Sequence, residues 1–470
     1  MNSSQRSKLL LLAAVGFFMQ TLDSTIVNTA LPAMARSLGE SPLRMQSVVV
    51  AYALTMAMLI PASGWMADRF GTRRVYFGAI TLFVLGSLLC ALSRNLDQLV
   101  AARVVQGMGG AMLLPVGRLA VLHEFPRDKF LRAMAFVAIP GLIGPVLGPT
   151  LGGLLVEYAS WHWIFLINIP VGLAGCVATL FYMPQRRSPK PRGFDLGGYL
   201  LLAFGMVGVS LALDGLSGMG LGRASAPVLL MFGLASLCAY WLHAARHPEP
   251  LFSPRLFSVP NVSIGLLGNL FSRTGSSCMP FLIPLLLQLS MGYSPAQAGM
   301  MMLPVAMSSL VSKSLSTRLI VYFGYRRVLV SNTILVGLVI ASFSLTSIDQ
   351  PLWLRLMQLG FFGAVNSLQF TAMNAIMLKD LDGELASSGN SLLSMVQMLA
   401  MSLGVAAAGT VLGAYSEYFS RLGSQQILQS FQATFATVGL MTMASAWIFW
   451  QLSPDTRRAA GEQDPPEAGS

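Results

Sequence analysis

The sequence has few charged residues for its length. Asp, Glu, Lys and Arg make up 10% of its 470 residues, whereas 54% are hydrophobic and the mean hydropathy is +0.65. This balance excludes a soluble globular domain and predicts an all-α protein that crosses a membrane many times. The net charge of +11 does not predict a nucleic-acid partner, because the basic residues lie in short loops between apolar runs.

Cysteine is also scarce, and nucleotide-binding motifs are missing. The four cysteines, Cys90, Cys176, Cys238 and Cys278, all lie in apolar runs and form no CxxC pair, so we expect neither a disulfide nor a metal site. The sequence contains no phosphate-binding P-loop, so ATP is not the expected source of energy. Nothing in it indicates an enzyme or a cofactor.

Apolar runs of membrane-spanning length recur along the chain. The first follows Lys8 and is too long for a signal peptide, so we expect it to remain as an anchor. Fourteen spans would place both termini on the same side of the membrane. The runs are 9–31, 46–67, 75–92, 99–122, 133–156, 163–182, 195–214, 225–243, 261–289, 296–316, 328–347, 352–378, 386–415 and 428–452.

The basic residues indicate which side the termini face. With the N-terminus placed in the cytoplasm, 20 of the 30 Lys and Arg lie on the cytoplasmic side and only six lie opposite. This bias predicts that both termini are cytoplasmic.

An internal repeat divides the chain. FGTRRV at 70–75 and FGYRRV at 323–328 each follow an apolar run and predict a tight cytoplasmic turn, with Gly permitting the bend. The repeat predicts two six-helix bundles with two helices inserted between them. The expected units are 1–182 (N-terminal bundle), 183–260 (linkers and inserted helices), 261–452 (C-terminal bundle) and 453–470 (disordered tail).

A single acid, Asp23, lies well inside a predicted span. It stands about fourteen residues past the start of its run, or ~21 Å along a helix, within the core of a bilayer. A carboxylate there must be protonated or partnered, which suits a proton carrier. The alternative is a structural Asp bonded to a neighbouring helix with help from Ser24, Thr25 and Asn28.

Arg103 lies about one turn inside the fourth span from its predicted non-cytoplasmic end, and Asp23 lies about eight residues from that same side, so their depths match within roughly a turn. If it lies near Asp23, protonation of Asp23 would release it, which would make a proton-linked switch. Gln106 lies one turn deeper. The alternative is that Arg103 snorkels to the membrane surface.

The loop GWMADRFGTRR at 64–74 mixes one acid with three arginines. Gly64 is expected to let two helices approach closely. Asp68 is expected to pair with a nearby Arg or with the N-terminus of the thirteenth span at 387–390, as a latch. The alternative is a plain basic loop. The predicted cytoplasmic gate comprises Gly64, Asp68, Arg69, Gly71, Arg73 and Arg74.

The fifth span contains GLIGPVLGPTLGG at 141–153. Its small residues recur every fourth position, which favours backbone-to-backbone helix packing, and its prolines bend or loosen the helix. We expect a helix that rocks against its neighbour, although a static kink is the alternative. The predicted hinge comprises Gly144, Pro145, Gly148, Pro149 and Gly152.

Together these motifs resemble the major facilitator superfamily, and specifically its fourteen-span drug:proton antiporters. LDSTIVNTALP at 22–32, the 64–74 loop, Arg103 with Gln106 and Gly107, GPVLGPTLGG and WHWIFLINIPVG at 161–172 carry the resemblance, which covers nearly the whole chain. It implies the major facilitator fold, export driven by proton entry through alternating access, and a multi-pass protein of the bacterial inner membrane. We expect a monomer that binds small molecules, protons and lipid. The second copy of the loop departs from the pattern, with Val321 in place of Asp68.

Three functions are consistent with these features. A multidrug exporter would use walls rich in Met and Phe, of which the chain has 28 and 26. An exporter of organic anions, such as citrate-like carboxylates or their metal chelates, would use Arg118, Arg273 and Lys313. A channel or lipid-sensing scaffold is the third, which Asp23 disfavours. The predicted substrate cavity includes Asn28, Gln106, Arg118 and Arg273.

Overall fold

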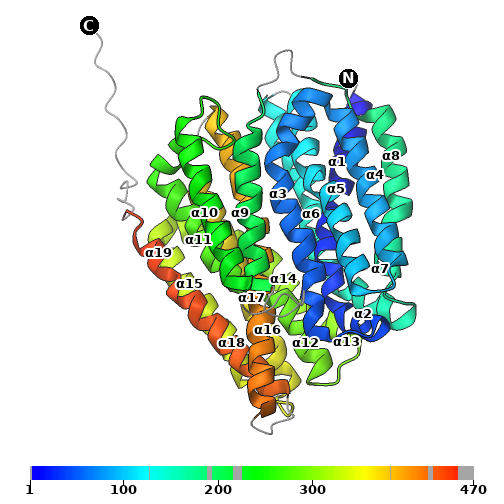
Figure 1. Cartoon of the computed structure of the whole chain (residues 1–470), viewed down its shortest axis with the longest axis vertical. Coiled ribbons are helices and arrows are strands. Elements are labelled where there is room, and N and C mark those ends of the chain that lie inside the picture. The colour runs from blue at the N-terminus through cyan, green and yellow to red at the C-terminus, as the bar shows by residue number, and fades with distance from the viewer. Residues whose placement is uncertain are drawn as a thin grey trace.

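The computed structural model describes residues 3–125, 127–187, 193–214, 225–381, 383–421 and 427–453. Every regular element among them is helical (Figure 1). The α-helices are α1 (Ser3–Ile26), α2 (Leu31–Leu38), α3 (Gln46–Phe70), α4 (Thr72–Leu92), α5 (Leu96–Glu124), α6 (Arg127–Tyr158), α7 (Trp163–Leu166), α8 (Asn168–Tyr182), α9 (Leu196–Asp214), α10 (Ser225–Arg246), α11 (Pro260–Ser277), α12 (Met279–Leu289), α13 (Pro295–Met300), α14 (Leu303–Phe323), α15 (Tyr325–Ser342), α16 (Leu352–Leu378), α17 (Gly383–Arg421), α18 (Ile427–Ala444) and α19 (Ala446–Trp450), and the 3₁₀-helices are η1 (Val27–Thr29), η2 (Pro42–Met45), η3 (Pro254–Ser258) and η4 (Phe343–Leu345).

Thirteen of the described helical segments are long and apolar enough to cross a membrane, and they match thirteen of the fourteen predicted runs. The remaining run, 352–378, forms α16, a 27-residue helix that carries polar residues such as Arg355 and Gln369. α16 packs against α11, α14 and α15. The all-helical membrane fold is therefore confirmed, whereas the fourteen-span count and the cytoplasmic position of both termini stay predictions.

Four predicted spans are divided between two α-helices, and two of them, 163–182 and 428–452, form α7 with α8 and α18 with α19. In the other two, a proline explains the break. The run 261–289 is divided between α11 and α12 at Cys278, just before Pro280, and the run 296–316 is divided between α13 and α14 just before Pro304. Proline lacks a backbone N–H and fits only the first turn of a helix, so each break falls next to one.

The two copies of the repeated turn have the same backbone conformation. Gly71 ends α3 with φ +92°, and Gly324 ends α14 with φ +80°. Residues with a side chain rarely adopt such positive φ values, which explains why each copy has glycine at this position. The predicted turns are confirmed at both positions.

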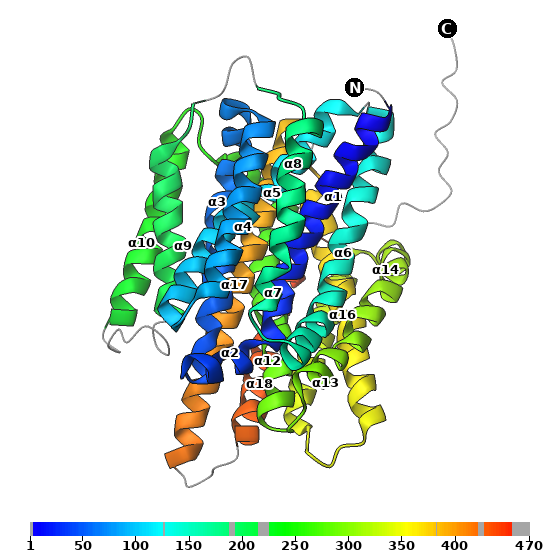
Figure 2. The same ribbon diagram turned by 90° about the vertical axis from the view of Figure 1, so that its right-hand side faces the viewer.

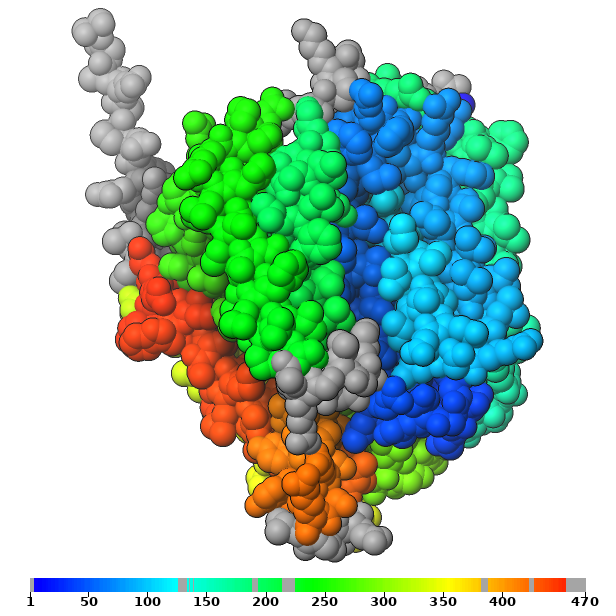
Figure 3. Space-filling view, viewed as in Figure 1, coloured from blue at the N-terminus to red at the C-terminus, as the bar shows by residue number. Residues whose placement is uncertain are grey.

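The helices of residues 3–182 pack mainly among themselves, with α1 against α6 and α4 against α5 and α8. Those from residue 260 onward do the same, with α14 against α16 and α15 against α18 (Figures 1 and 2). α9 and α10 pair with each other beside α17 and α3, and Figure 3 shows them as a green ridge along one face. α10 exposes apolar side chains such as Met231 and Phe232, as a lipid-facing helix does.

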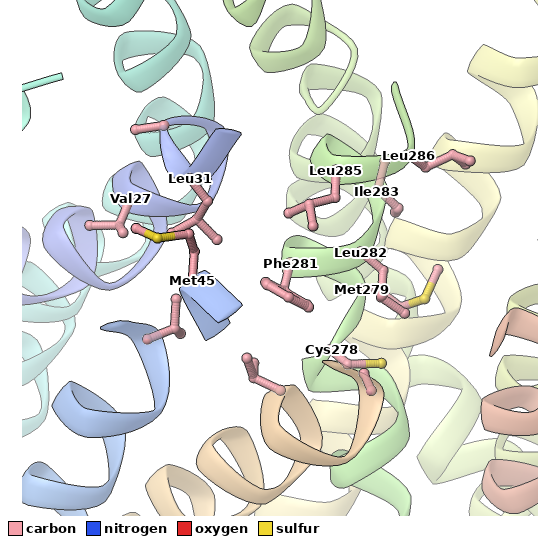
Figure 4. Close-up of a cluster of buried hydrophobic side chains, with 14 of the residues drawn as sticks. Val27, Leu31, Met45, Cys278, Met279, Phe281, Leu282, Ile283, Leu285 and Leu286 are labelled. Carbon is pink, nitrogen blue, oxygen red and sulfur yellow. The ribbon is translucent and has the colours of Figure 1, made fainter. Parts of the chain in front are cut away.

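The largest hydrophobic cluster joins the two sets of helices at the end of the molecule away from the N-terminus (Figures 1 and 4). Val27, Leu31 and Met45 come from one set, and Phe281 and Leu285 come from the other. All five side chains are at most 1% exposed. This packing closes the end that the distribution of charge predicts to be non-cytoplasmic.

Candidate functional site

Asp23 and Arg103 form an ion pair in the interior of the first set of helices. Arg103 Nη1 lies 2.6 Å from Asp23 Oδ2, and the two side chains are 1% and 0% exposed. Asp23 comes from the last third of α1 and Arg103 from the third turn of α5. The matching depths predicted from sequence are thus confirmed by direct contact.

Amide side chains complete the shell around the carboxylate. Gln106 Nε2 donates to Asp23 Oδ1 at 2.8 Å, and Asn168 Nδ2 from α8 donates to the same oxygen at 3.1 Å. Both amides also donate to Ser87 Oγ of α4, at 2.8 and 3.3 Å. The network therefore joins α1, α4, α5 and α8 through one acid.

Arg103 makes further contacts that fix its guanidinium group. Its Nη1 donates to Gln106 Oε1 at 2.6 Å, and its Nε donates to the carbonyl oxygen of Val48 in α3 at 3.2 Å. The guanidinium carbon lies 4.0 Å from the centre of the Tyr52 ring, also in α3. Such stacking suits arginine, which is more weakly hydrated than lysine and has a planar charged group.

Glycines let the helices approach closely at this point. A Cβ atom on Gly86 of α4 would lie within 3 Å of the backbone of Gln106, and one on Gly109 of α5 would collide with the backbone of Phe83. Gly86 and Gly109 thus bring α4 against α5 next to the network.

The arrangement offsets the cost of burying a charged pair. A buried carboxylate is costly unless it is paired and hydrogen bonded, and here both oxygens have donors. Protonation would remove the charge that attracts Arg103 and leave that cation buried without an acid. The charge of Asp23 and the contacts that join α1 to α5 therefore depend on each other.

Sequence reasoning found Asp23 and Arg103 but missed several of their partners. Asn168 lies in WHWIFLINIPVG at 161–172, which carried the family resemblance but did not indicate a contact with Asp23. Ser87 and Tyr52 lie in apolar runs that carry no local signal. Gln106 was predicted to face the substrate cavity, whereas in this structure it is fully buried within the ion-pair network.

The other predicted cavity residues lie on three different elements, with Arg118 in α5 and Arg273 in α11. Asn28 lies in η1 and is 2% exposed, and its Oδ1 has no hydrogen-bond partner in the part of the chain that the structure describes. Arg118 and Arg273 are half-buried, and among the described residues neither forms an ion pair. Arg273 instead lies 4.4 Å from the centre of the Phe370 ring. Their role in binding substrate stays a prediction.

The predicted gate loop is held by the segment that follows α8, which the sequence did not indicate. Arg73 Nε donates to the carbonyl oxygen of Met183 at 2.6 Å, and Gln185 Nε2 donates to that of Phe70 at 3.1 Å. Asp68 is half-buried, and Arg69 and Arg74 are exposed. Part of the predicted partner region, including the side chain of residue 387, lies outside the described residues, so the latch to α17 stays a prediction.

One structural expectation for the gate is wrong. No described atom lies within 4 Å of the point where a Cβ on Gly64 would stand, and Gly64 is exposed. Gly64 therefore does not serve a close approach of two helices here, because its side of α3 does not face a neighbouring helix at this level.

The small face of α6 packs against α1, as the spacing of its glycines predicted. A Cβ on Gly144 would collide with Thr21, one on Gly148 with Thr25, and one on Gly152 with the backbone of Ile26. Pro145 is exposed, whereas Pro149 is buried and its carbonyl lies against Gly299 of α13. The hinge role itself stays a prediction.

Comparison with solved structures identifies the fold. The fold matches a D-xylose-proton symporter with a TM-score of 0.69 over 96% of this chain and 98% of that one, at 14% identity. It also matches the human organic anion transporter MFSD10, with a TM-score of 0.60 over 96% and 100% of the two chains, at 16% identity. The chain thus has the fold of a membrane transporter.

Sequence comparison identifies the family. The family model for the Major Facilitator Superfamily matches residues 13–405 and, overlapping, 265–468. Proteins named "Putative multidrug resistance protein MdtD" are 52% identical in Serratia proteamaculans, over 95% of this chain and 93% of the relative, and 51% identical in Pectobacterium atrosepticum, over 95% of each. The chain belongs to the major facilitator superfamily, as its motifs predicted.

Proposed function

We propose that this protein is a proton-coupled exporter of small molecules that works by alternating access in the bacterial inner membrane. The observation that carries the proposal is the fully buried pair of Asp23 and Arg103. A transporter coupled to protons needs an acid whose protonation changes how helices are held together, and this pair supplies one.

The pair would act as the coupling switch. With Asp23 ionised, the network ties α1 to α4, α5 and α8. Loading a proton removes this tie, and α1 can then shift on the small-residue face of α6. The packed contact around Val27 and Phe281 would open in the alternate state, while the opposite end would close.

The proposed organisation follows from the repeat. Residues 1–182 and 261–452 would form the two moving bundles, and 183–260 would carry the linkers and the inserted pair α9 and α10. Both termini would lie in the cytoplasm, with Asp68 latching the bundles there, and the protein would act as a monomer surrounded by lipid. The tail at 454–470 lies outside the described residues.

A multidrug substrate range is the better-supported proposal, because the relatives at about 50% identity carry multidrug resistance in their names. The organic-anion alternative depends on Arg273, a half-buried cation with no ion-pair partner among the described residues. Its stacking on Phe370 gives it a partner without any substrate, which makes that alternative the weaker one.

The test is substrate-driven proton movement in everted membrane vesicles. Asp23→Asn keeps the shape of the side chain but removes its titration, so we expect loss of proton-coupled efflux while the protein still folds and inserts. Asp97→Asn is the matched control, because Asp97 is an exposed acid at the start of the helix that carries Arg103.

Coupled transport at the wild-type rate in Asp23→Asn would overturn the proposal. Efflux of a hydrophobic cation that persists in Arg273→Ala supports the multidrug range. Citrate efflux by the wild type that disappears in Arg273→Ala would instead favour the anion exporter.

A further inference from the structure

Three side chains with metal-binding chemistry converge where the inserted helices α9 and α10 meet the adjoining loops. Asp195 immediately precedes α9, His243 lies in the last turn of α10, and His247 follows that helix by one residue. Their potential ligand atoms all lie within 4.8 Å of one another. None of these residues belongs to the ion-pair network.

The local backbone places the two imidazoles on one side of the helix. The N–H of His247 donates to the carbonyl oxygen of His243 at 2.9 Å, so the helical turn continues through His247. The rings stack with their centres 5.1 Å apart. Two histidines four residues apart at a helix face are a recurring arrangement for binding Zn²⁺.

Asp195 is held in position by hydrogen bonds from its surroundings. It is 5% exposed, and its Oδ1 accepts from the N–H of Gly198 at 2.8 Å and lies 2.7 Å from His243 Nε2. Its Oδ2 accepts from the N–H of Leu251 at 3.3 Å. Such outer bonds orient a carboxylate ligand.

An ion pair between Asp195 and His243 alone would not explain why His247 lies beside them. His247 adds a second imidazole next to the pair, and among the described residues this ring accepts a hydrogen bond, at Nδ1, from the N–H of Glu249 at 3.3 Å. His243 and His247 are partly exposed. An ion could therefore enter from solvent, and a water molecule could fill the remaining coordination position.

We infer that Asp195, His243 and His247 form a binding site for a divalent transition-metal ion of the Zn²⁺ class. One carboxylate oxygen and two neutral imidazole nitrogens are ligands that this class prefers over Mg²⁺ or Ca²⁺. The ion replaces the proton between Asp195 and His243 and joins the start of α9 to the end of α10.

The test measures Zn²⁺ binding to the purified full-length protein in detergent, by titration calorimetry and by the thermal unfolding midpoint. We expect one Zn²⁺ per chain, a raised midpoint with Zn²⁺ but not with Mg²⁺, and an affinity at least about tenfold weaker in His247→Gln. His123→Gln is the matched control, because His123 is an exposed histidine at the end of α5.

Two results would overturn the inference. If Zn²⁺ does not shift the unfolding midpoint of the wild type, the cluster binds no ion. If Zn²⁺ shifts the midpoint of His247→Gln as much as that of the wild type, the protein binds an adventitious ion only. If His247→Gln does not fold, the visible spectrum of the Co²⁺-loaded wild type decides. Intense ligand-field bands support the site, and the weak spectrum of hydrated Co²⁺ refutes it.

Discussion

Two buried polar networks lie in the two sets of helices, and they differ in charge. The first contains the acid Asp23 and the base Arg103. The second joins Gln369, Asn332 and Thr333 of α16 and α15, with no ionisable member: Gln369 Nε2 donates to Thr333 Oγ1 at 2.6 Å and Asn332 Nδ2 donates to Gln369 Oε1 at 2.8 Å. All five side chains are at most 4% exposed.

The difference separates two uses of buried polarity. Both networks satisfy hydrogen bonds across helices and so fix how those helices pack. Only the first can gain or lose a proton, so only the first can link helix packing to a proton gradient. The second is expected to hold α11, α15 and α16 together in every state of the transport cycle, since Gln369 also reaches Ser272 of α11.

Removing a charge should be the most damaging change. Arg103→Ala leaves the carboxylate of Asp23 buried without its cation, which is expected to cost about 3–5 kcal/mol. The double variant Asp23→Asn with Arg103→Ala removes both charges, so we expect it to be more stable than Arg103→Ala alone. Thermal unfolding midpoints of the purified variants in detergent measure both effects.

Gln369→Ala is the control from the neutral network. It leaves Thr333 and Asn332 short of one partner each, at an expected cost of about 1–3 kcal/mol, while proton-coupled transport remains. The contrast between the networks fails if Gln369→Ala is as damaging as Arg103→Ala, or if the double variant is no more stable than the single one.

The sequence predicted the charged network better than the neutral one, for a physical reason. A charge inside an apolar run is conspicuous because burying it is costly, so Asp23 and Arg103 stood out and their depths could be matched. Gln369 and Thr333 are ordinary polar residues in a helix, and nothing local shows which helix they face. Asn168 was missed for the same reason, although it donates directly to Asp23.

The fold was predictable wherever one residue type determines the backbone. Gly71 and Gly324 predicted their turns because few other residues tolerate positive φ. The spacing of glycines in α6 predicted its close packing against α1. The open surroundings of Gly64 show that a single glycine does not by itself predict a close approach of two helices. The contact of the gate loop with residues 183–187 depends on tertiary structure alone, so no local pattern announced it.

The packing of α1 on α6 offers a smaller and more specific test. Gly144→Ala adds one carbon that collides with Thr21, so we expect destabilisation of about 1–3 kcal/mol and slower turnover. Gly64→Ala adds the same carbon in open space, where the higher helix propensity of Ala should stabilise by up to about 1 kcal/mol. Unfolding midpoints that move in the same direction for both variants would contradict the role assigned to this face.

The smallest expected effect concerns a polar contact between the two sets of helices. Glu157 at the end of α6 accepts from Ser294 Oγ at 2.6 Å and from the N–H of Ala296 at 2.9 Å, at the start of α13. Beside it, Thr150 Oγ1 donates to the carbonyl oxygen of Gly299 at 3.3 Å. This contact lies at the closed end of the molecule and must separate if that end opens.

Glu157→Gln keeps the shape of the side chain but removes its charge from the N-terminus of α13, which weakens the contact by about 0.3–1 kcal/mol. We therefore expect a cysteine introduced at Thr150 to react with a membrane-impermeant maleimide about two- to fivefold faster in this variant. Glu417→Gln is the control, since Glu417 pairs with Arg421 within one exposed helical turn. Equal labelling rates in the two variants would show that the charge of Glu157 does not help to close this end.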